Sequence, residues 1–169
     1  AQHRKSSSNH PAFLVFSRQR DGFCPPVCAA LLSTRRLLVW PSSPDNSISL
    51  RFVNYSEDDI ILEVYAKKVA DVYGAAFAIQ FDPTVFQYIA ATEGTFFGSN
   101  SGQTTFMAAG GTGSITIGNS LLGSEVQPIT GSGPICAIVL RALENGQSQF
   151  TFVEQRLFDS SGAKISGVQ

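Results

Sequence analysis

Between residues 71 and 83 the chain alternates large apolar residues with small or polar ones. Phe77, Ile79 and Phe81 occupy one phase of this alternation, and alanine and glutamine occupy the other. A period of two is typical of a β-strand that buries one face. Pro83 ends the run, because proline has no backbone N–H to donate to a sheet. We therefore expect a central strand in this stretch.

Similar short runs continue from residue 46 to the end of the chain, and clusters of Gly, Asn, Asp and Ser separate them. Their spacing of roughly 8–12 residues is typical of a β-sandwich or barrel. No run has the length and period of a three-turn helix. Two sheets, each with one solvent-facing side, would account for about nine such strands. We expect the core to bury Phe52, Leu62, Phe77, Ile79, Phe81, Ile117, Ile138, Leu140, Phe150 and Phe152.

Residues 1–45 have a different pattern, in which prolines and basic patches separate short apolar islands. These islands are too short to bury a core of their own, and such a segment is disordered when nothing holds it. The sequence therefore predicts two parts, an irregular extended arm over 1–45 and a sandwich domain over 46–169. The arm lies across its own domain or is clamped by a partner.

Charge divides the chain in the same way. The first 40 residues carry six Lys or Arg and one acid, a net charge of +5, whereas the remainder carries six Lys or Arg and twelve acids, a net charge of −6. A basic arm on an acidic body suggests contact with an acidic surface, which is a protein, lipid headgroups or the body itself. The alternative is that these charges only keep a loose segment soluble. The acidic body argues against nucleic-acid binding.

The sequence offers no pattern for catalysis or for a metal. His3 and His10 are the only histidines, and no nucleophile or carboxylate stands near them to form an acid–base pair. Cys24 and Cys28 lack two further metal ligands, so they form a small disulfide or remain two free thiols. Cys136 reads as a small core residue. We predict no enzyme activity, no metal and no cofactor.

One acidic run, one Asp-Ser-Ser-Gly segment and one glycine run are interpreted as turns. Residues 57–59 and 159–162 lack the alternating oxygen ligands of a dedicated calcium loop, so solvated turns are the simpler interpretation. Residues 110–113 are glycine-rich, but no Lys-Ser/Thr pair or helix follows them, as a phosphate-binding loop requires.

The order of these segments resembles the cohesin domain. DVYGAAFAIQFDPTVFQYIAATEGTFF resembles the family's strand, Phe-Asp-Pro turn and Gly-Phe-Phe-like loop, and SITIGNSLLGS, GSGPICAIVLRALENGQSQFTF and LFDSSGAKI follow in sequence. The resemblance covers about residues 46–168. It implies a nine-stranded jelly-roll-like β-sandwich, and cohesin domains of cellulosomal scaffolds bind dockerin modules non-covalently through one sheet face. Many cohesin-like domains lie in other secreted or surface proteins. This chain differs from the scaffold pattern in its basic arm and its single copy.

We therefore expect a non-catalytic protein–protein interaction module outside the cytoplasm. An accessory subunit of a larger, membrane-bound assembly on its periplasmic side fits this description. Ala1-Gln2 is what signal-peptidase cleavage commonly leaves, which favours an exported protein, periplasmic or extracellular. The longest apolar run in the arm, Val27 to Leu32, falls far short of the ~20 residues that a spanning helix needs.

Candidate contact residues follow from this expectation. In the arm, apolar anchors and rim charges are the usual elements of a protein interface; they are Phe13, Leu14, Phe16, Arg18, Arg20, Arg35, Arg36, Leu37, Leu38 and Trp40. An alternative function is a carbohydrate- or dockerin-binding module of a secreted surface protein. For carbohydrate, Tyr88, Phe96 and Phe97 would form a stacking platform, unless these loop aromatics tuck over the end of the sandwich.

Overall fold

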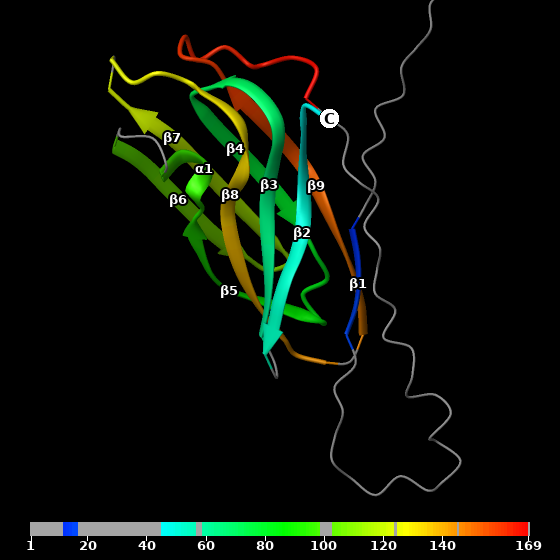
Figure 1. Cartoon of the computed structure of the whole chain (residues 1–169). Helices are drawn as coiled ribbons and strands as arrows, with labels where there is room; N and C mark the ends of the chain where they lie inside the picture. The colour runs from blue at the N-terminus through cyan, green and yellow to red at the C-terminus, as the bar shows by residue number, and fades with distance from the viewer. Residues whose placement is uncertain are drawn as a thin grey trace, which may run out of the picture.

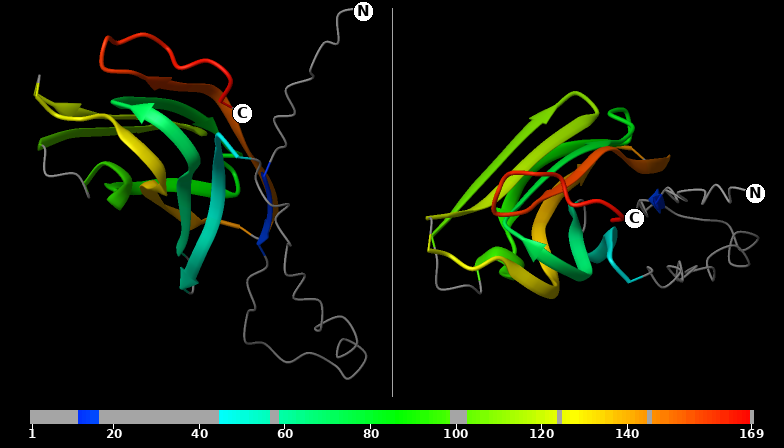
Figure 2. Two further views of the ribbon diagram at one scale, coloured as in Figure 1. Left: turned by 45° about the horizontal axis from the view of Figure 1, so that its top comes forward. Right: turned by 90° about the horizontal axis from the view of Figure 1, so that it is seen from above.

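A computed structural model describes residues 12–16, 45–56, 59–98, 103–123, 125–144 and 146–168. Over these residues the chain forms nine strands and one short helix. The strands make two antiparallel sheets packed face to face, which the view from above in Figure 2 shows as two layers. The predicted all-β sandwich is confirmed.

The sheet at the back of Figure 1 has five strands. Its central strand β4 is the stretch that the alternation around Phe77 predicts, and β9 and β7 flank it. In order across the sheet, the strands are β1 (Ala12–Phe16), β9 (Gly146–Phe158), β4 (Gly74–Gln80), β7 (Ser114–Leu122) and β6 (Gln103–Gly111).

The front sheet has four strands, of which β3 and β8 are central. Both are long because one face of each is buried at nearly every second residue. In order across the sheet, the strands are β2 (Ser47–Ser56), β3 (Asp59–Val72), β8 (Ile129–Ala142) and β5 (Phe86–Glu93).

Eight of the nine strands lie within residues 46–168, one fewer than predicted for this range, and the ninth is β1 from the predicted arm. β1 pairs antiparallel with β9, with Ala12 opposite Phe150 and Phe16 opposite Gly146. The physical reason is that the island AFLVF is rich in residues that favour strands, and β9 is the last strand of the sandwich on this side. This part of the arm therefore belongs to the sheet.

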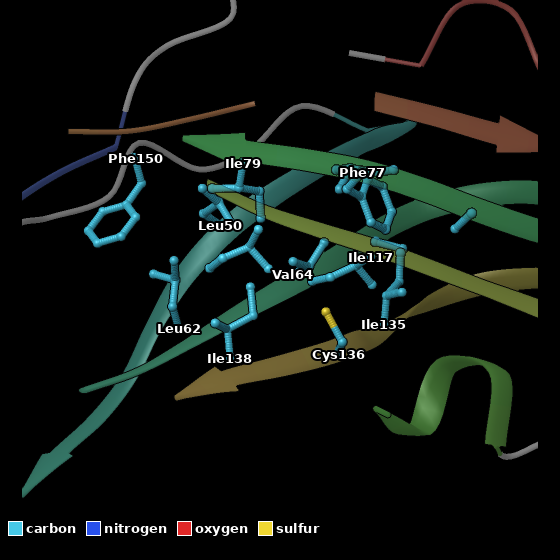
Figure 3. Close-up of a cluster of buried hydrophobic side chains, with 14 of the residues drawn as sticks. Leu50, Leu62, Val64, Phe77, Ile79, Ile117, Ile135, Cys136, Ile138 and Phe150 are labelled. Atoms are coloured by element: carbon cyan, nitrogen blue, oxygen red, sulfur yellow. The ribbon is translucent and has the colours of Figure 1, made fainter. Parts of the chain in front are cut away.

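The core lies between the sheets, where side chains of both layers interdigitate (Figure 3). Val64 from β3 and Phe77 from β4 are essentially inaccessible to solvent. Phe150 stacks against Phe81 with ring centroids 6.0 Å apart. Each fully buried side chain of this size contributes about 1.5–3 kcal/mol. Phe52 departs from the prediction and is 38% exposed, because it lies on the edge strand β2 beside a register shift.

Helix α1 (Thr95–Gly98) follows β5 and packs against β8. It buries Phe96 and Phe97, whose rings meet edge to face with centroids 5.2 Å apart. Gly94, just before the helix, donates its N–H to the Ile135 carbonyl oxygen at 2.8 Å. A Cβ at residue 94 would lie 2.2 Å from the Pro134 carbonyl oxygen, so only glycine fits this close approach.

Candidate partner-binding surface

The described residues hold no group of three or more His, Cys, Asp and Glu that could bind a metal ion. Cys136 is buried and unbridged, as the sequence predicts for a core residue, and burial raises the pKa of its thiol to about 12. A thiol in this state is inert as a nucleophile. Both histidines, Cys24 and Cys28 lie outside the described residues, so the disulfide stays a prediction.

The Asp-Ser-Ser-Gly segment at residues 159–162 forms a turn that uses the Asp159 carboxylate. Asp159 Oδ1 accepts hydrogen bonds from the Ser161 hydroxyl at 2.6 Å, the Ser161 N–H at 2.8 Å and the Ala163 N–H at 3.0 Å. These bonds hold the pKa of Asp159 below its usual value, and the bond from the Ser161 hydroxyl has the largest effect. The carboxylate therefore organises the loop after β9.

The three aromatic residues proposed for carbohydrate stacking do not share an exposed surface. Phe96 and Phe97 are 3% and 0% exposed, so both rings lie inside the sandwich. Tyr88 is partly buried and covers Gly110, where an added Cβ would lie 2.0 Å from the ring. Phe96 and Phe97 come from α1, whereas Tyr88 comes from strand β5.

The predicted arm contacts are described only in part. Phe13, Leu14 and Phe16 lie in β1, at register positions opposite Gln149, Ser148 and Gly146 of β9. This pairing accounts for the position of the strand without a partner. In the described part of the chain, no helix is long and apolar enough to cross a membrane. The remaining predicted contacts lie outside the described residues and stay predictions: Arg18, Arg20, Arg35, Arg36, Leu37, Leu38 and Trp40.

The outer face of the five-stranded sheet carries a trough whose floor is made of small residues. Gly118 on β7 lies opposite Ala76 on β4, and Ala78 is the next outward residue of β4. An added Cβ at Gly118 would meet nothing within 4 Å, so the space above it is open. We call these three residues, with the side chains that border them on β6 and β9, the trough.

Larger side chains border the trough. On β6, Met107 lies opposite Gly118 and is 67% exposed, a high value for an apolar side chain. On β9, Arg156 and Glu154 form an ion pair with Nη2 and Oε1 2.6 Å apart. Arg156 lies opposite Ala76, and Glu154 opposite Ala78. The trough therefore has an apolar border on one side and a charged border on the other.

At one end the trough opens into a depression of about 470 Å³. Met107 and Gly118 line it from the sheet, and the turn at 159–162 closes it. No sequence motif marks this surface. The signal was nevertheless present, since the outward phase of strand β4 reads Ala76, Ala78, Gln80, with small residues where long polar ones are usual on an exposed face.

Comparison with known proteins finds the family model of the cohesin domain at residues 53–168. No curated protein sequence matches the chain. A type II cohesin domain from the cellulosome of Acetivibrio cellulolyticus is similar in structure, with a TM-score of 0.63 and 16% identity over 75% of this chain and 92% of that one.

Two further solved structures are similar. In a type II cohesin–X-dockerin complex from the same organism, the similar chain gives a TM-score of 0.62 and 19% identity over 73% of this chain and 93% of that one. A non-cellulosomal cohesin from Archaeoglobus fulgidus gives a TM-score of 0.51 and 16% identity over 72% of this chain and 84% of that one. At these identities, the similarity shows the fold.

Proposed function

The chain belongs to the cohesin family, and from this premise we propose that it is a non-catalytic module that binds another protein through the trough. The observation that carries the proposal is the small-residue floor of Gly118, Ala76 and Ala78 beside an exposed Met107. On an exposed sheet face, side chains normally stand several ångströms above the backbone. Here a partner's side chains can approach the backbone itself.

The chemistry of the trough suggests what the partner presents. A large apolar side chain seated over Gly118 would contact the Met107 thioether, which adapts its shape to what it meets. The Arg156–Glu154 pair would form the polar rim, where charges set orientation more than affinity. We infer a folded protein surface with one or two apolar anchors flanked by polar groups.

We further propose that the partner is a subunit of a larger assembly outside the cytoplasm, periplasmic or extracellular. One similar domain comes from the cellulosome of Acetivibrio cellulolyticus, and another similar chain from this organism is in complex with an X-dockerin. The basic arm, with its net charge of +5 in the first 40 residues, would add a second contact with a protein or membrane surface. Binding to a dockerin module is the alternative that the complex supports.

Photo-crosslinking from the trough tests this proposal. The photoreactive residue p-benzoylphenylalanine replaces Met107 in the full chain, and replaces Ile89 on the outer face of the other sheet in a matched control. We expect one protein from the source extract to cross-link from position 107 and not from position 89. Equal cross-linking from both positions would contradict the proposal.

The captured protein is then purified and titrated against the unmodified chain and Gly118→Arg. Because an added Cβ at Gly118 meets nothing within 4 Å, an arginine at this position can extend its side chain outward over the trough. We expect binding to weaken at least about tenfold, a cost of ~1.4 kcal/mol. Leu143→Lys, at a 45% exposed position that follows β8, serves as the control and should bind as the unmodified chain does. Unchanged affinity of Gly118→Arg would place the interface elsewhere.

A further inference from the structure

The outer face of the four-stranded sheet carries a row of aliphatic side chains that crosses all four strands. Ile61 on β3 lies opposite Val139 on β8, and both are half-buried. At the two edges the register places Asn54 of β2 opposite Ile61 and Ala90 of β5 opposite Val139, and the residues just before them, Val53 and Ile89, are 54% and 40% exposed. We call Val53, Ile61, Val139 and Ile89 the aliphatic row.

Bulges place the two outer members of the aliphatic row. The register of β2 against β3 shifts between Phe52 and Asn54, and Val53 occupies the shift. The register of β5 against β8 shifts in the same way, and Ile89 occupies that shift. Bulges re-aim side chains at sheet edges. Both edges therefore present a branched aliphatic residue beside the same central pair.

The flanking rows carry charges. On one side, Arg141 of β8 binds Asp59 of β3 with Nε–Oδ1 and Nη2–Oδ2 distances of 2.8 and 3.2 Å. On the other side, Glu63 of β3 lies opposite Ala137 of β8, and Arg51 of β2 lies opposite Glu63. The charged side chains thus surround the aliphatic row without interrupting it.

This pattern is complementary to itself. Consider a second copy that lies face to face with the first and is related to it by a two-fold axis parallel to the strands, between β3 and β8. The strand order of the second copy is then reversed, so that its β8 faces β3 of the first copy. Ile61 then faces the second copy's Val139, and Asp59 faces the second copy's Arg141, twice by symmetry. Glu63 faces Ala137. No like charges among these residues oppose each other.

An axis along the aliphatic row would give a different result. Each strand would then face the same strand of the second copy, and the charged row on one side of the aliphatic row would face the charged row from its other side. Glu63 would therefore face the second copy's Asp59. Like charges brought face to face cost affinity. The charges therefore select the axis parallel to the strands. Sheets packed face to face keep their strands within about 30° of each other, which this axis allows.

We propose that the aliphatic row is the interface of a back-to-back dimer of this chain. Strands lie ~4.8 Å apart and alternate residues on one face ~6.8 Å apart, so four strands and three rows cover ~20 × 20 Å with their side chains. Two copies bury ~800 Å² in total, below the ~1,200 Å² of stable complexes. The dimer is accordingly weak, with a Kd on the order of 10⁻⁴ M.

The dimer has a consequence that rests on the proposed function, although dimerisation itself does not. Because the trough lies on the outer face of the five-stranded sheet and the aliphatic row on the outer face of the four-stranded sheet, the dimer presents its two troughs on opposite sides. A partner with two binding modules, joined by a linker long enough to reach both sides of the dimer, then binds with an effective concentration that strengthens each contact.

Sedimentation velocity over about 20 µM to 1 mM of the full chain, a range that brackets the expected Kd, tests the proposal. We expect a concentration-dependent shift from monomer to dimer. The double variant Val53→Lys/Ile89→Lys should remain monomeric, and Met107→Lys on the opposite face should dimerise as the unmodified chain does. A chain that stays monomeric at about 1 mM would overturn the proposal.

A charge swap separates this dimer from nonspecific association. Asp59→Arg/Arg141→Glu keeps the ion pair within each copy and reverses its direction. The swapped chain should dimerise with itself as the unmodified chain does, within about threefold, because each arginine again faces a carboxylate. Mixed with the unmodified chain it should associate at least about tenfold more weakly, since carboxylate then faces carboxylate. Equal mixed association would overturn the proposed geometry.

Discussion

Replacing Gly94 by alanine should destabilise the sandwich strongly, although only one methyl group is added. The new Cβ would lie 2.2 Å from the Pro134 carbonyl oxygen, 2.6 Å from the Pro134 carbonyl carbon and 2.9 Å from the Ile135 carbonyl carbon. These are backbone atoms of β8, which pairs with β3 and β5 on its two sides. The strand therefore cannot move away, as a flexible side chain would.

The size of the effect follows from two contributions. Overpacking in a close-packed interior typically costs ~1–3 kcal/mol. Residue 94 must in addition shift outward, because a Cβ cannot stay 2.2 Å from a carbonyl oxygen, so it also loses the hydrogen bond from its N–H to Ile135, worth ~0.5–1.5 kcal/mol, and loosens the docking of α1. The expected loss is about 2–4 kcal/mol in the free energy of unfolding.

Urea unfolding followed by far-UV circular dichroism measures this loss. With a slope of ~2 kcal/mol/M, the midpoint should fall by about 1–2 M. Gly98→Ala is the matched control, because an added Cβ at the end of α1 meets nothing within 4 Å, and its effect should stay within about 0.5 kcal/mol. A Gly94→Ala midpoint equal to that of the unmodified chain would refute the close approach of residue 94 to β8.

Three further predictions concern single residues. Gly110→Ala should cost less than Gly94→Ala, about 1–2 kcal/mol in the same urea assay, because the Tyr88 ring over Gly110 can swing away. Cys136 should resist alkylation at about pH 8 in the folded protein and react only after unfolding, because burial raises the pKa of its thiol to about 12 and leaves only ~10⁻⁴ of the thiol ionised at that pH. Peptide mass mapping of the alkylated protein would show this. Asp159 has a lowered pKa in the folded state, so it stabilises the fold above its unfolded pKa of ~3.9, and this stabilisation is lost as pH falls through the lowered value. Asp159→Asn should therefore lose less stability than the unmodified chain between about pH 5 and pH 2, and an equal loss would contradict this role.

Most of the sandwich could be predicted from the sequence because its strands alternate strongly. The period around Phe77 and Ile79 gives β4 and its buried face. β8 is apolar over most of PICAIVLRA, which predicts a strand covered on both faces; in the structure Ile138 and Leu140 are buried, whereas Ala137 and Val139 on the outer face are half-buried. The order of these segments also carries the cohesin resemblance, which the family model at residues 53–168 confirms.

Local composition does not determine which edge a strand joins. The island AFLVF reads as an apolar segment of an arm, and nothing in its five residues specifies pairing with β9. Phe52 alternates with Ile48 and Leu50 as a core residue would, yet the register shift beside it on an edge strand leaves it 38% exposed. Register shifts come from the sheet as a whole.

Neither the trough nor the aliphatic row could be predicted from the sequence, for a related reason. The trough combines residues of β4, β6, β7 and β9, whose small and outward positions become one floor only when the strands are placed side by side. The aliphatic row likewise needs the register of four strands. Sequence reasoning instead favoured aromatic residues, and Phe97 is wholly buried.

Hydrogen–deuterium exchange of the full chain, with and without the partner captured from the trough, tests the central claim most directly. The account predicts slower exchange in β6 (Gln103–Gly111) and in the turn at 159–162, which border the trough and its depression. It predicts unchanged exchange in β2 and β5 at the same protein concentration. Protection confined to β2 and β5 would contradict the account and place the partner on the opposite sheet.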